Sequence, residues 1–139
     1  MYRVGKDIPA GEYYVENNSE YTGYYAVTSD ANGNHILEND NFKTHTFITL
    51  EDGQYIELTR GKMTSAKNTP IFQFDNGVIT EGMYPVGKDI PGGNYQAIAT
   101  TSYSGYYELL NNSTINRDII SNASFFTSRY VKNFLTISI

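Results

Sequence analysis

Few residues in this chain of 139 could support catalysis. It contains two histidines, His35 and His45, and no cysteine. A disulfide framework, a thiolate metal site and a cysteine nucleophile are therefore excluded, and two imidazoles are too few for a multi-histidine metal cage. No Gly-x-Ser-x-Gly nucleophile elbow occurs, and no pair of carboxylates stands in an apolar setting that would tune a pKa. We expect no enzymatic activity and no cofactor, with a hydrolase as the most distant alternative.

One segment resembles the start of a cation-binding loop. Residues 30–34, DANGN, place oxygen-bearing side chains at alternate positions, as a calcium loop does. An EF-hand also needs glycine at its sixth position and glutamate at its twelfth, whereas here the fourth residue is Gly33 and the twelfth is Asn41. We therefore expect a polar hairpin turn and no metal site.

The 13 tyrosines are the other residues with chemical potential. A tyrosine ring is flat and apolar with a polar tip, which suits a sugar, a peptide or a partner protein. The candidate ligand-binding residues, which we expect to be exposed, are Tyr14, Tyr21, Tyr24, Tyr103 and Tyr106. The alternative is that these aromatic residues simply make good strands and cross-strand pairs. The lack of tryptophan argues against a dedicated sugar platform.

An internal repeat supplies the elements that must position these side chains. Residues 1–25 and 83–107 share 14 identical residues in 25 at a constant offset of 82. The similarity continues at an offset of 83, and after a shortened turn Leu58 aligns with Ile137. We predict two copies, residues 1–60 and 83–139, joined by a linker at 61–82 that is partly strand. A 60-residue unit buries too little surface for comfortable stability, so we expect the copies to pack on each other or to exchange strands.

Each copy has the pattern of an all-β fold. Short segments rich in Tyr, Val, Ile, Thr and Phe alternate with Gly, Asn and Asp at about 8–12-residue spacing, which is typical of a β-sandwich. No segment has an apolar period of 3.6 over a helix length, so we expect little or no helix. Alternation predicts that Tyr25 and Val27, like Tyr107 and Leu109, are buried. Tyr24 and Tyr106 then point to the opposite face.

Both copies contain the string GKDIP followed by glycine and tyrosine. It predicts a turn over DIPAG and DIPGG, with proline at the second position and glycine supplying a positive φ. Its structural residues are Gly5, Asp7, Pro9, Gly11, Gly87, Asp89, Pro91 and Gly93. The alternative is that the Lys–Asp pair of each string grips a ligand. Turn geometry accounts for glycine, aspartate and proline together, so we favour the structural interpretation.

Charge limits the partners. The net charge of −5 argues against a nucleic-acid partner, and no window of 18 apolar residues predicts a membrane span. The first copy carries −6 and the second +1. Two copies with such different fields are poorly suited to one charged ligand, so a common ligand is expected to be neutral.

The string YRVGKDIPAGEY, then GYYAV, FKTHTFITL and EDGQYIEL, resembles a small β-module. That module recurs in exported lipoproteins and surface proteins of Gram-positive bacteria, and it has no established ligand or catalytic residue. The resemblance implies an extracellular or cell-surface location, with a leader or anchor outside this chain. Our interpretation is a non-catalytic surface module that binds or adheres to a neutral glycan or a protein. The alternative is a purely structural spacer or self-assembly module.

Overall fold

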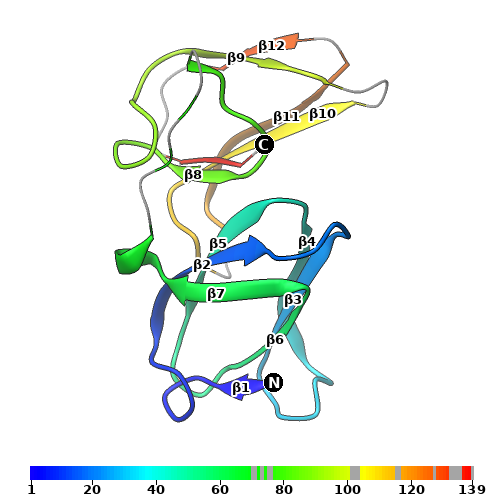
Figure 1. Ribbon diagram of the computed structural model, residues 1–139, viewed down its shortest axis with the longest axis vertical. Helices are drawn as coiled ribbons and strands as arrows, with labels where there is room; N and C mark the ends of the chain where they lie inside the picture. The colour runs from blue at the N-terminus through cyan, green and yellow to red at the C-terminus, as the bar shows by residue number, and fades with distance from the viewer. Residues whose placement is uncertain are drawn as a thin grey trace. The chain divides into compact units, whose positions relative to one another are not determined.

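Segments rich in β-branched and aromatic residues form the strands of the computed structural model (Figure 1). The structure describes residues 1–69, 72, 74, 77–100, 104–114, 117–126, 128–131 and 136–138. The predicted all-β class with little helix is confirmed, because these residues contain thirteen strands and one short 3₁₀ helix. Among the described residues, no helix is long and apolar enough to cross a membrane.

Contacts divide the chain into two units, residues 1–69 with 113–116 and residues 70–112 with 117–139. The first unit contains β1 (Tyr2–Arg3), β2 (Gly11–Asn17), β3 (Gly23–Thr28), β4 (Ile36–Phe42), β5 (His45–Leu50), β6 (Tyr55–Thr59), β7 (Gly61–Ser65) and the 3₁₀ helix η1 (Ala66–Asn68). Its sheets have the strand orders β1-β6-β3-β4 and β5-β2-β7. The unit thus extends past residue 60, because β7 pairs with β2.

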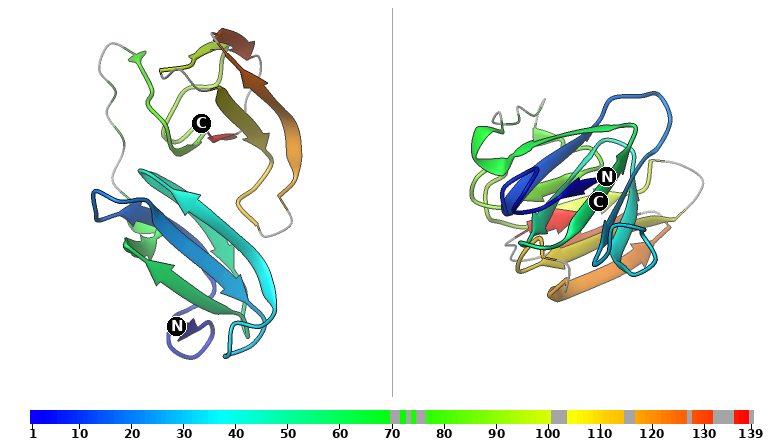
Figure 2. Two further views of the ribbon diagram at one scale, coloured as in Figure 1. Left: turned by 90° about the vertical axis from the view of Figure 1, so that its right-hand side faces the viewer. Right: turned by 90° about the horizontal axis from the view of Figure 1, so that it is seen from below.

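The second unit contains β8 (Met83–Pro85), β9 (Tyr95–Ile98), β10 (Gly105–Leu110), β11 (Ile119–Phe125), β12 (Ser128–Val131) and β13 (Thr136–Ser138). Its described strands form a four-stranded sheet of order β11-β10-β13-β8 and a pair, β12-β9. The β10–β11 hairpin is seen clearly in the left panel of Figure 2.

Both sheets of the first unit contribute to one core. Tyr25 and Val27 of β3 are buried in the same cluster as Val15 of β2 and Ile48 of β5. In the second unit, Tyr107 and Leu109 are buried with Tyr84, Ile90 and Phe125. The predicted burial of Tyr25, Val27, Tyr107 and Leu109 is therefore confirmed.

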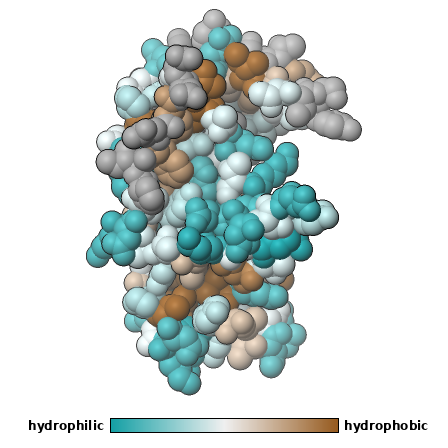
Figure 3. Space-filling view, viewed as in Figure 1, coloured by the Kyte–Doolittle hydropathy of each residue, from teal (hydrophilic) through white to brown (hydrophobic). Residues whose placement is uncertain are grey.

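Part of the core of the first unit is only partly shielded from solvent. Three apolar side chains that pack against the core are half-buried, namely Ile8, Leu58 and Met63. The space-filling view accordingly shows apolar surface on the first unit near β7 (Figure 3).

The chain turns sharply between the two sheets of the first unit at Phe42 and Arg60. Phe42 ends β4, and β5 begins in the other sheet three residues later. Arg60 lies between β6 and β7 with φ +54°, which is uncommon for a residue with a side chain. The ring of Phe42 lies against Gly23 and Gly61, where an added Cβ would come within 2.5 and 2.8 Å of it.

Corresponding residues of the two units take corresponding places in the ladders. Gly23 pairs with Phe42, and Gly105 pairs with Phe125. Both hairpins also have a register shift before the last residue of their first strand, at Thr28 and at Leu110. These pairings reproduce the sequence offsets of 82 and 83.

The last strand corrects the alignment made from the sequence. Ile137 pairs with Leu109 and Tyr84, as Ile56 pairs with Val27 and Tyr2. Ile137 therefore corresponds to Ile56, and the alignment with Leu58 was wrong by two residues. A two-residue slip keeps every side chain on its face, so the apolar pattern cannot detect it.

Gly23→Ala and Gly105→Ala each force a methyl group against the phenylalanine ring across the ladder. We expect each to lower the free energy of unfolding by about 1–3 kcal/mol in denaturant titrations, as overpacking does. Gly93→Ala is the control, since its Cβ would meet no atom within 4 Å and its φ is not positive. A similar loss in all three variants would contradict the role given to the two rings.

Candidate functional site

The shared GKDIP string closes a tight turn in the first unit. The turn lies at residues 5–7, ahead of the position predicted over DIPAG, and Gly5 adopts φ +86°. The N–H of Asp7 donates to the Arg3 carbonyl, and the N–H of Arg3 donates back to Asp7 Oδ2, each at 2.8 Å. The Tyr13 hydroxyl donates to the Pro9 carbonyl at 2.6 Å. Asp7 therefore caps the turn with its side chain.

The same turn in the second unit lacks one donor. Gly87 has φ +91°, and the N–H of Asp89 donates to the Pro85 carbonyl at 2.9 Å. Proline has no N–H, so Pro85 cannot return a bond to Asp89 as Arg3 does to Asp7. Asp89 is only 7% exposed, and within the described part of the chain neither carboxylate oxygen has a hydrogen-bond partner. Burial raises the pKa of Asp89, and the nearby Lys88 ammonium opposes this rise.

Of the candidate tyrosines, Tyr106 has the richest polar surroundings. It is 44% exposed on β10, and its hydroxyl donates to Glu108 Oε1 at 2.8 Å. Arg117 Nη1 donates to the other oxygen of Glu108 at 2.9 Å. The Asn122 side chain also hydrogen-bonds the Tyr106 hydroxyl. Burial and the Glu108 carboxylate raise the pKa of Tyr106.

The first unit keeps part of this arrangement. Tyr24 is half-buried on β3, two residues before Ala26, and Asn39 lies across the ladder from Ala26. Asn122 lies across from Glu108 in the same way. Both units therefore place a tyrosine and an asparagine on one face of a hairpin. The carboxylate–guanidinium pair belongs to the second unit.

The other three candidate tyrosines have different positions. Tyr21 is 66% exposed in the loop after β2, and the Asn17 side chain donates to its carbonyl at 2.8 Å. The prediction that Tyr14 is exposed was wrong. It is 9% exposed, and its ring lies 5.5 Å from those of His45 and Phe47. Alternation failed at this strand because Tyr13, Tyr14 and Val15 are all buried, so both of its faces are covered. Tyr103 lies outside the described residues.

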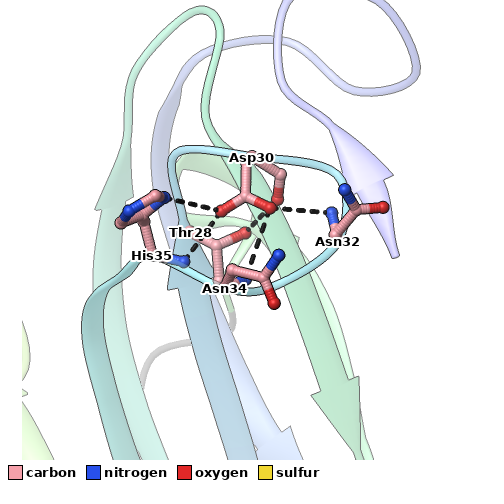
Figure 4. A network of polar contacts seen from close by, with 5 residues as sticks. All are labelled: Thr28, Asp30, Asn32, Asn34 and His35. Carbon is pink, nitrogen blue, oxygen red and sulfur yellow. Dashed lines mark hydrogen bonds and ion pairs between the residues drawn. The ribbon is translucent and has the colours of Figure 1, made fainter.

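The DANGN segment forms the polar hairpin loop between β3 and β4 (Figure 4). Asp30 Oδ1 accepts the N–H groups of Asn32 and Asn34 at 2.9 and 3.3 Å, and Oδ2 accepts that of His35 at 2.8 Å. These hydrogen bonds hold the pKa of Asp30 below its ordinary value, and the bond from the His35 N–H has the largest effect. The Thr28 hydroxyl donates to the Asp30 carbonyl at 2.9 Å. The carboxylate is thus engaged by the loop's own backbone.

The two histidines lie in unlike settings. The side chain of His35 is 81% exposed and 3.5 Å from Asp30, whereas His45 is buried between aromatic rings. Among the described residues, no three His, Asp or Glu side chains are grouped so that they could hold a metal ion.

Sequence reasoning missed the Glu108–Arg117 pair and the unpaired state of Asp89. Glu108 and Arg117 are nine residues apart and meet only through the β10–β11 hairpin. The difference between Arg3 and Pro85, within an otherwise shared string, was the available signal for Asp89.

Asp89→Asn should stabilise the chain at pH 7 by about 1 kcal/mol, because it removes a buried charge that has no donor. The pKa of Asp89 is higher in the folded than in the unfolded chain. The free energy of unfolding therefore falls as the pH rises from the unfolded pKa through the folded pKa. The gain should therefore disappear below about pH 4, where the group is protonated in both states. Thermal melts at several pH values measure this, with Asp7→Asn as the control that gives no gain. An equal gain at every pH would contradict the assignment.

No family model, curated protein or solved structure matches this chain. The geometry of its own residues therefore carries the functional proposal.

Proposed function

We propose that this chain is a non-catalytic binding or adhesion module built from two copies of one small β-sandwich. The equal pairings of the β3–β4 and β10–β11 hairpins support the duplication, as do 14 identities in 25 residues. The core shared by the two sheets of the first unit supports the sandwich. The resemblance to bacterial surface modules supports a place outside the cell.

The surface around Tyr106 carries the proposal. Its exposed ring offers an apolar face, the exposed Asn122 adds an amide beside the hydroxyl, and Glu108 holds the hydroxyl in place. A sugar ring presents apolar C–H groups on one side and hydroxyls around its rim, so an aromatic face with a flanking amide complements it. We infer a neutral glycan as the ligand, with an extended protein surface as the alternative.

Tyr24 and Asn39 give the first unit a simpler version of the same surface. Ala26 stands there in place of Glu108, so the carboxylate that holds the Tyr106 hydroxyl is missing at that position. We therefore assign the stronger binding to the second unit. Two linked sites of unequal strength would still raise the overall avidity for a repetitive ligand.

A structural role is the second candidate, and exposed apolar pairs favour it. Ile36 and Leu37 are exposed at the start of β4, and Ile119 and Ile120 are exposed at the start of β11. Both strands lie at the edge of their sheets. Exposed apolar edges promote pairing between chains, so a self-assembling spacer would use these positions.

Replacing both Tyr24 and Tyr106 by Ala tests binding against structure. We expect the signal on a glycan array to fall by at least about tenfold, since aromatic contacts dominate such sites. Tyr106→Ala alone should account for most of the fall. The melting temperature should change little, because Tyr106 is exposed and Tyr24 only half-buried.

Tyr21→Ala is the control, because Tyr21 is exposed but lies in the loop after β2. It should leave both the array signal and the melting temperature unchanged. An unchanged array signal in the double variant would reject the Tyr106 surface as a binding site. Self-association lost on replacing Ile36 and Ile119 by Lys, without any glycan signal, would favour the spacer.

A further inference from the structure

The polar groups around Tyr106 form a chain of hydrogen bonds with a fixed direction. The Arg117 guanidinium can only donate, and its Nη1 donates to Glu108 Oε2 at 2.9 Å. The Tyr106 hydroxyl donates its single hydrogen to Glu108 Oε1 at 2.8 Å. Toward Asn122 this hydroxyl can therefore act only as an acceptor, so the amide nitrogen of Asn122 donates to it.

This direction decides which atom of Asn122 is left for a ligand. An amide carries its donor hydrogens on nitrogen and its lone pairs on oxygen, and the nitrogen is held by Tyr106. Asn122 is exposed on β11, which lies at the edge of its sheet. Within the described part of the chain, its Oδ1 accepts no hydrogen bond. Asn122 therefore presents an open acceptor beside an exposed aromatic ring.

The first unit does not orient its asparagine in this way. Asn39 lies across the ladder from Ala26, which has no carboxylate to take the hydrogen of the Tyr24 hydroxyl. Among residues 1–69, no hydrogen bond joins the Tyr24 hydroxyl to the Asn39 side chain. The amide of Asn39 thus lacks the support that Asn122 receives, and Asn39 serves as a matched control position.

We propose that Asn122 determines the specificity of the Tyr106 surface, because its Oδ1 accepts a hydrogen bond from a hydroxyl of the ligand. Arg117, Glu108 and the Tyr106 hydroxyl are positioning groups, and the Tyr106 ring packs on the apolar face of the sugar. This inference rests on the proposed glycan function and adds the requirement that the sugar donate a hydrogen at this place. A methyl ether has no hydrogen to donate, so it cannot make the contact.

The direction of the chain is tested without any ligand, through the pKa of Tyr106 measured by NMR on ring-labelled tyrosine. Asn122→Ala should raise this pKa, because the phenolate would lose a donor. Glu108→Gln should lower it, because a negative charge beside the phenol is removed. Asn39→Ala is the control and should leave the pKa of Tyr106 unchanged. A lowered or unchanged pKa in Asn122→Ala would overturn the proposal.

The recognised group is tested on an array that carries neutral glycans in free and in fully O-methylated form. Asn122→Ala should weaken binding to the free form by about three- to tenfold, the worth of one neutral hydrogen bond, and leave the methylated form unaffected. Tyr106→Phe keeps the ring but releases the Asn122 amide, so it should cause a similar loss. The double variant should then bind no more weakly than Asn122→Ala alone, because the two residues act as one unit.

The outcomes separate this inference from the glycan function itself. Losses that multiply in the double variant would mean that the Tyr106 hydroxyl contacts the sugar directly, and they would overturn the positioning role. Equal binding of the free and methylated glycans would also overturn the inference, while leaving the glycan function intact. Absence of any signal on both forms would reject the glycan function and the hydroxyl contact together.

Discussion

The hydrogen bond from a tyrosine hydroxyl to the carbonyl of the proline four residues earlier organises both units. Tyr13 donates to Pro9, and Tyr95 donates to Pro91. The bond spans the place where the chain leaves the sheet of β1 or β8 and enters that of β2 or β9. Together with the positive φ of Gly5 and of Gly87, the bond fixes the direction in which the next strand starts. The string common to both units is thus accounted for by folding, and function has to be sought where the units differ.

Three differences between the units change the chemistry of the second one. Pro85 removes the donor that would satisfy Asp89, Glu108 joins Tyr106 to Arg117, and Ile98 stands where the first unit has Glu16. Each lies at a turn, a sheet face or a strand edge, where the fold tolerates substitution more readily than in its core. The second unit is accordingly where we place the glycan surface. The first unit is the more acidic of the two.

Much of the fold followed from the sequence, because alternation and turn residues act locally. The burial of Tyr25 and Tyr107 was predicted from period two alone. The burial of Tyr14 was not predicted, because both faces of its strand are covered and alternation then carries no information. The register of β13 was missed because a slip of two leaves the pattern intact. The surface around Tyr106 depends on Arg117 crossing a hairpin, which residue spacing does not reveal until the register is known.

The hydroxyl-to-carbonyl bond is tested most directly by removing only the hydroxyl. Tyr13→Phe and Tyr95→Phe keep the ring and should each lower the free energy of unfolding by about 1 kcal/mol, the net worth of a hydrogen bond. Calorimetric unfolding of each variant measures this, with Tyr21→Phe as the control at an exposed position. We expect losses in the first two and none in the third. Stability unchanged in both Tyr13→Phe and Tyr95→Phe would contradict the account, because the shared turn would then hold without its bond.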